Sequence, residues 1–97
     1  MLFMINCTDK PGSFDLRAAT RSAHLAYLQR HAATLIQAGP LLDPDGRSTG
    51  SLLLVNVPGR SEAEALAAGD PYAEAGLFES TVIRGYRSVF RDGSLIE

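Results

Sequence analysis

The run Leu52-Leu53-Leu54-Val55 restricts the fold of this 97-residue chain more than any other feature. Its length, and the breaker Pro58-Gly59 that follows it, favour a β-strand over residues 51–57. Successive side chains of a strand point to opposite faces of its sheet, so a strand that is apolar at consecutive positions needs cover on both faces. The fold must therefore provide two covered sheet faces.

The surrounding pattern predicts two helices and three further strands. The expected order is β-α-β-β-α-β, over residues 2–8, 15–38, 41–42, 51–57, 61–68 and 77–90. Gly39-Pro40 should end the first helix, because glycine suits a left-handed cap and proline cannot continue the helix. Ser61 and Glu64 have the spacing of a capping box at the start of the second helix. Gly85 predicts a bulge or bend in the last strand.

This order predicts an α+β fold of the ferredoxin-like, split βαβ type, in which two helices cover one face of an antiparallel sheet. The length of the chain is that of one domain, residues 1–97. Two helices can cover only one of the two apolar faces at residues 52–55. We therefore expect a second copy of the chain to cover the other face, in a symmetric homodimer.

Composition excludes several classes of function. The formal net charge is −2 and Lys10 is the only lysine, so no basic patch that would bind nucleic acid is expected. The longest apolar run is far shorter than the roughly 20 residues of a membrane-spanning helix, which predicts no membrane partner. The N-terminus lacks the basic start of a signal peptide, so we expect a cytoplasmic protein. Cys7 is the single cysteine and is interpreted as a small buried residue rather than a nucleophile.

The first predicted helix carries the most informative polar residues. Its expected apolar stripe is formed by Leu25, Leu28, Ala32, Leu35 and Ile36. Arg21 falls within that stripe, and His24 falls at its edge. Either the two side chains reach into a site, or Arg21 extends to water and His24 is a histidine at the edge of the core. The spacing leaves both interpretations open.

Asp70 precedes Pro71 and also has two interpretations. An aspartate at this position is typical of a helix N-cap, whose carboxylate accepts backbone N–H groups. The same carboxylate, in a loop that leads to the last strand, could instead meet His24. A carboxylate partner fixes the tautomer of an imidazole and stabilises its charged form, which makes the histidine an effective acid or base.

Four segments of the chain resemble the YCII-related family in content and order. They are residues 21–28, with the pattern Arg-x-x-His-Leu; residues 37–42, with Ala-Gly-Pro; residues 50–53; and residues 69–78, with Asp-Pro-Tyr. The resemblance implies a dimeric α+β barrel of ferredoxin-like subunits. It also implies a cleft with a histidine and an aspartate, which correspond here to His24 and Asp70. A dehydrochlorinase of that family acts on a chlorinated hydroxyhydroquinone without a metal or an organic cofactor.

We therefore expect a small enzyme of the lyase or isomerase type that needs no cofactor and acts on a small organic molecule. His24 would carry the proton, Asp70 would orient His24, and Arg21 would hold an anionic group of the substrate. Further substrate contacts are expected from Ser51, Tyr72 and Phe78, although packing in the core explains the two aromatic residues equally well. A non-catalytic dimeric domain that binds a metabolite or assists another protein is the main alternative, and a cofactor-free oxygenase is a third.

No metal site or phosphate loop is predicted. His31 lies two helical turns beyond His24, about 10 Å along the axis, which is too far for the two to share a metal ion. We expect His31 at the surface or at an interface. Residues 46–50 lack the glycine spacing and the lysine of a phosphate-binding loop and are interpreted as a hairpin turn.

Overall fold

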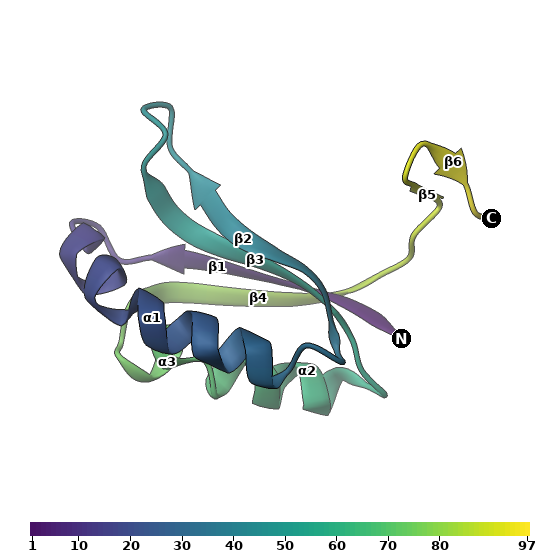
Figure 1. The fold of residues 1–97 in the computed structure, drawn as a ribbon, viewed down its shortest axis with the longest axis horizontal. Coiled ribbons are helices and arrows are strands. Elements are labelled where there is room, and N and C mark those ends of the chain that lie inside the picture. Colours follow the sequence, from purple (N-terminus) through teal and green to yellow (C-terminus); the bar gives the residue numbers. More distant parts are fainter.

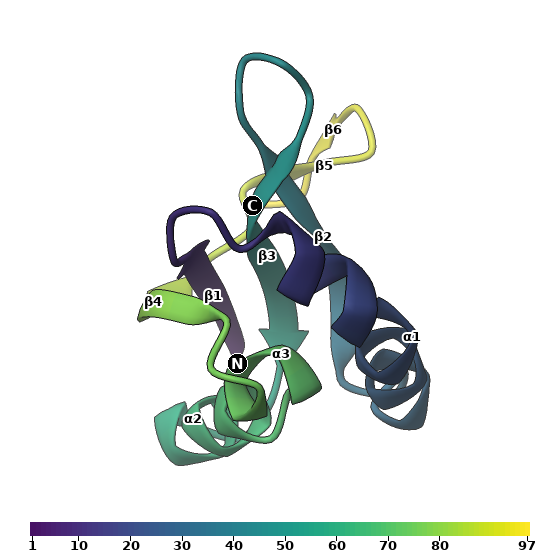
Figure 2. The same ribbon diagram turned by 90° about the vertical axis from the view of Figure 1, so that its left-hand side faces the viewer.

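A four-stranded antiparallel sheet forms the centre of the computed structural model, which describes residues 1–97. Its strands are β1 (Leu2–Asp9), β2 (Leu35–Leu42), β3 (Ser48–Asn56) and β4 (Phe78–Tyr86), in the order β2-β3-β1-β4. The helices α1 (Phe14–Arg30), α2 (Arg60–Ala68) and α3 (Pro71–Glu74) lie on one side of this sheet (Figures 1 and 2). The predicted ferredoxin-like α+β fold is confirmed.

The core lies between the sheet and the helices. Alternate residues of β1 and β3 face it, as the two-residue period of a strand requires. The main cluster of buried apolar residues from the strands and from α1 and α2 consists of Phe3, Ile5, Cys7, Leu53, Val55, Tyr27, Ala63 and Leu66. The alternation along β1 continues to Asp9, which places a carboxylate on the same buried side.

The first helix is shorter than predicted, and this expectation was wrong. α1 ends at Arg30, and Leu35–Leu42 forms the edge strand β2, which pairs with β3 from Leu35 opposite Val55 to Leu42 opposite Ser48. Gly39-Pro40 is thus part of a strand instead of a helix end. An edge strand tolerates proline because one side of its backbone needs no partner. The hydrogen bonds to β3 decide the structure of this segment, although its apolar residues also fit the period of a helix.

The buried face of α1 also differs from the predicted leucine stripe. The residues that α1 buries are Arg17, His24 and Tyr27, whereas Leu25 is 39% exposed and Arg21 is exposed. The helix therefore turns polar and aromatic side chains toward the rest of the protein. This orientation creates the site described below.

Three local predictions need correction. α2 begins at Arg60 with Gly59 as its N-cap, and the hydroxyl of Ser61 donates to Glu62 instead of closing a capping box. Gly85 pairs in register with Phe3, and the irregularity in that ladder lies at Thr8 and Asp9. The last sheet strand stops at Tyr86. The chain ends in a separate hairpin of β5 (Phe90–Arg91) and β6 (Ser94–Leu95), which projects away from the sheet (Figure 1).

The sheet face away from the helices stays uncovered within one chain. Leu53 and Val55 of β3 face the core, but Leu52 and Leu54 line an open hollow on the opposite face together with Met4 and Tyr86. Leu52 is 37% exposed and Val82 on β4 is 49% exposed. None of the helices combines the length and the apolar character needed to cross a membrane.

Candidate active site

A cavity of about 540 Å³ lies beside α1. Its lining comes from α1, from β2 and the turn that joins β2 to β3, from Ser51 of β3 and from Tyr72 of α3. This volume is in the range of pockets that hold small organic molecules. Elements that are distant in sequence thus converge on one space, into which α1 contributes Arg17, Arg21 and His24.

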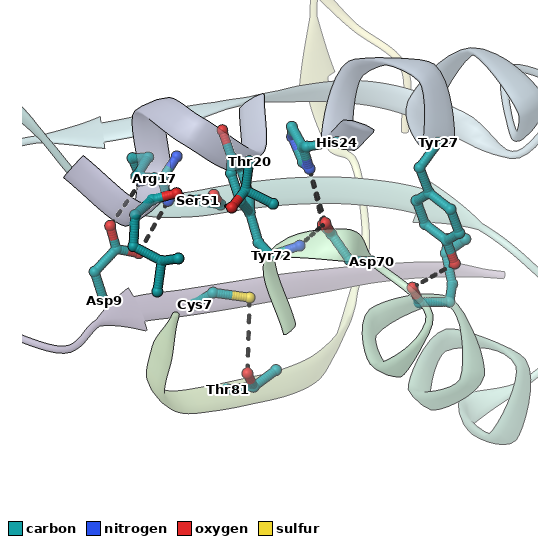
Figure 3. Close-up of polar contacts among 12 residues, drawn as sticks. Cys7, Asp9, Arg17, Thr20, His24, Tyr27, Ser51, Asp70, Tyr72 and Thr81 are labelled. Carbon is teal, nitrogen blue, oxygen red and sulfur yellow. Dashed lines mark hydrogen bonds and ion pairs between the residues drawn. The ribbon is translucent and has the colours of Figure 1, made fainter. Parts of the chain in front are cut away.

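His24 and Asp70 are in direct contact at the wall of this cavity (Figure 3). The Nδ1 atom of His24 lies 2.9 Å from Oδ1 and 3.1 Å from Oδ2 of Asp70. Oδ1 also accepts the backbone N–H of Tyr72 at 2.9 Å, as the N-cap of α3. The two interpretations of Asp70 are therefore both true, because one carboxylate caps α3 and meets the imidazole.

The contact with Asp70 determines which imidazole nitrogen is available. A carboxylate can only accept, so Nδ1 carries the proton and the neutral ring presents Nε2 as an acceptor. His24 is 8% exposed, and Nε2 has no hydrogen-bond partner in the protein. Because every fully buried polar side-chain atom has a partner, Nε2 must reach solvent, and the cavity that His24 lines provides it. This arrangement suits a general base.

Tyr72 holds the imidazole ring from one side. The ring centres of His24 and Tyr72 lie 4.1 Å apart and the planes differ by 21°, so the two rings are stacked. Burial raises the pKa of Tyr72 against the opposing effect of the positive charges of Arg17 and Arg21, so its phenol stays neutral near pH 7. The ring centres of Phe78 and Tyr72 lie 6.1 Å apart in an edge-to-face arrangement, and Phe78 does not line the cavity. The predicted substrate contact from Phe78 does not fit this placement.

Arg17 is a part of the site that the sequence analysis missed. Its Nε donates to Oδ2 of Asp9 at 2.7 Å, while one terminal nitrogen donates to Oδ1 of Asp9 at 2.9 Å and to the hydroxyl of Ser51 at 2.8 Å (Figure 3). Burial alone would lower the pKa of Arg17, but its hydrogen bonds and ion pair with Asp9 raise it. Its guanidinium carbon lies 4.5 Å from the ring centre of Tyr72. Arg17 thus links the end of β1 to the aromatic ring beside His24.

Sequence comparison identifies the family. The profile of the YCII-related domain matches residues 1–87. This chain belongs to the YCII-related family. Protein YciI of Escherichia coli O6:H1 is 34% identical over 98 residues, covering 93% of this chain and 100% of its own length. An uncharacterised Haemophilus influenzae protein is 33% identical over the same coverage.

A solved member of the YCII-related family provides a structural comparison. The 5-chloro-2-hydroxyhydroquinone dehydrochlorinase of Burkholderia phenoliruptrix, in complex with 2,5-dihydroxybenzoquinone, superposes with a TM-score of 0.83 at 35% identity. The match covers 90% of this chain and 94% of the dehydrochlorinase. An antibiotic biosynthesis monooxygenase at 12% identity and a TM-score of 0.53 shares the fold alone.

The other residues considered in the sequence of this YCII-related chain lie either in the cavity lining or outside it. Arg21 lines the cavity and has no ion pair, whereas Ser51 lines it while bonded to Arg17. His31 is the C-cap of α1, and its ring centre lies 4.4 Å from that of Tyr27, outside the cavity. Burial raises the pKa of Cys7 to about 11, which makes it a poor nucleophile at neutral pH. No three His, Cys, Asp or Glu side chains gather where they could hold a metal ion.

Proposed function

We propose that this YCII-related protein is a small enzyme of the lyase or isomerase type that transfers a proton without a cofactor, as in dehydrochlorination. The observation that carries the proposal is the His24–Asp70 contact of 2.9 Å, with the second imidazole nitrogen facing a cavity of substrate size. The likeness to a dehydrochlorinase favours a small cyclic substrate. The cavity can hold a ring of that size.

In the proposed reaction, Nε2 of His24 takes a proton from a hydroxyl or an activated C–H group of the substrate. Asp70 stabilises the imidazolium that forms, because its carboxylate faces the Nδ1–H group. On an aromatic substrate, the ring carbon that bears the leaving group first gains a proton as the ring passes to its keto tautomer. Removal of a further proton then sends an electron pair along the ring, and a leaving group such as chloride departs from that carbon with the electrons of its own bond. In net terms the substrate loses one proton and one anion, so no oxidant or reductant is needed. In an isomerisation, the same proton would return to another carbon.

Arg21 and Tyr72 would act on the charge that develops in this step. The guanidinium of Arg21 lines the cavity one helical turn from His24 and can bind an enolate or a carboxylate oxygen. The phenol of Tyr72, which stays neutral, can donate a hydrogen bond without competing for the proton. Ser51 would contribute by fixing Arg17.

Chloride release tests the proposal. The purified protein is incubated with 5-chloro-2-hydroxyhydroquinone, other halogenated phenols and small carboxylated lactones, and the free chloride and the ultraviolet spectra are followed. We expect the protein to convert at least one compound faster than a heat-denatured control does. The rate should be the same when a chelator is present. Binding without conversion of any compound would contradict catalysis and favour the non-catalytic metabolite-binding domain.

We also propose that the chain is a homodimer joined through the open sheet face. Met4, Leu52, Leu54 and Tyr86 line the hollow on that face, and an apolar surface of this kind is unusual on a stable monomer. Light scattering at micromolar concentration should give twice the 10.4 kDa mass of one chain. Leu52→Glu should shift the mass toward the monomer, and Leu16→Glu, at an exposed position of α1 outside the cavity lining, should not. A wild-type protein that is monomeric under these conditions would contradict this arrangement.

A further inference from the structure

The charge of the cavity lining differs from the charge of the whole chain. The chain has a formal net charge of −2, yet Arg17, Arg21 and Arg47 line the cavity and no aspartate or glutamate does. Asp9 compensates Arg17 through a bidentate ion pair. Arg21 and Arg47 have no carboxylate within ion-pairing distance, so two cations in the lining remain without a counter-charge.

The surroundings of Arg47 hold it in place without forming an ion pair with its guanidinium. It closes the turn between β2 and β3, where its backbone N–H and that of Asp45 both donate to Oδ1 of Asp43 at 2.9 Å. The carboxylate of Asp43 therefore binds the backbone of the turn, and no ion pair joins it or Asp45 to the guanidinium. The guanidinium carbon of Arg47 lies 3.4 Å from the ring centre of Phe14, the first residue of α1.

This stacking determines what Arg47 can bind. A guanidinium that lies flat on an aromatic ring keeps its edge N–H groups free to donate in the plane of the fork. The loop between β2 and β3 extends beyond the sheet near the start of α1 (Figures 1 and 2). Arg47 therefore lines the cavity from the hairpin, while Arg21 lines it from α1.

We propose that Arg21 and Arg47 form an anion-binding subsite for the carboxylate of a small cyclic acid, and that Arg47 is a specificity-determining residue of the cavity. A planar carboxylate matches the fork of an arginine, and two unpaired forks around one space favour it over a neutral group. The remaining lining includes Leu25, Leu28, Ala38 and Pro40, which suit the apolar part of a ring. This inference rests on the proposed function only in placing the ligand in the same cavity.

Two probes that differ by one carboxylate test the subsite. Binding of 2,5-dihydroxybenzoate and of hydroquinone is measured by calorimetry on the wild-type protein, on Arg47→Gln and on Arg91→Gln, an exposed arginine of β5 that does not line the cavity. We expect the wild type to bind the carboxylate at least about 10-fold more tightly than hydroquinone. Arg47→Gln should remove most of this preference and leave hydroquinone binding unchanged, whereas Arg91→Gln should keep it.

Three results would overturn the subsite: no measurable binding of 2,5-dihydroxybenzoate, equal affinity for both probes, or a preference that survives in Arg47→Gln. The measurement needs no turnover, so its outcome is independent of catalysis. A preference that depends on Arg47 in a protein without chloride release would retain the subsite and reject the enzyme. Chloride release by a protein without that preference would support the enzyme and reject the subsite.

Discussion

Replacing Asp70 by asparagine should lower kcat/KM by about 1,000-fold or more while the protein stays folded. Asparagine caps a helix about as well as aspartate, so α3 should keep its N-cap and the melting temperature should change little. The neutral amide cannot stabilise an imidazolium, and it can select the wrong tautomer of His24. Asp70→Asn therefore separates the two roles that the single carboxylate combines, which Asp70→Ala would remove together.

The measurement combines kinetics with NMR. kcat/KM is determined on a compound that the wild type converts, and ¹H–¹⁵N spectra of the His24 ring report which nitrogen carries the proton. Asp15→Asn, an exposed carboxylate in the first turn of α1, is the matched control and should keep the wild-type rate. If Asp70→Asn kept both the wild-type rate and the Nδ1–H tautomer, Asp70 would be a helix cap and nothing more.

Replacing Arg17 by methionine should cost about 3–5 kcal/mol of the free energy of unfolding. The loss is large because Asp9 would stay buried without its ion pair and its two hydrogen bonds. Methionine retains much of the length and apolar contact of the arginine stem. The loss of stability therefore comes mainly from the unpaired carboxylate of Asp9. A change of this size is a large fraction of the stability of a small domain.

Urea denaturation of four proteins checks this expectation. Arg17→Met alone should unfold at much lower urea concentration than the wild type. The double variant Arg17→Met/Asp9→Leu should recover much of the loss, because it removes both buried charges. Arg87→Met, at an exposed position after β4, should stay within about 0.5 kcal/mol of the wild type. A loss below about 1 kcal/mol for Arg17→Met would show that Asp9 does not depend on the pair.

The sequence predicts the sheet better than the ends of its helices. The consecutive apolar residues of β3 and the breakers on both sides indicate the strand and the need for two covered faces. Leu35 and Ile36, however, fit the period of a helix as well as a strand. Their strand structure depends on pairing with β3, for which no local signal exists.

The candidate site was predictable in part. His24 and Asp70 were found through the family pattern, although only the fold shows that one carboxylate can serve both as cap and as partner. The leucine stripe does not indicate Arg17, because α1 buries a different face from the one that the leucines predict. Two signals could have revealed it: Arg17 is seven residues before His24 and so shares its face of the helix, and Asp9 continues the alternation of Phe3, Ile5 and Cys7.

The rate of chloride release by His24→Gln, compared with the wild type under the same conditions, tests the role of His24 most directly. Glutamine can keep a hydrogen bond to Asp70 but cannot take up a proton from the substrate. We predict a folded variant whose rate is lower by about 100- to 10,000-fold, as expected for the loss of a general base. A His24→Gln protein that releases chloride at the wild-type rate would contradict the assignment of His24 as the base.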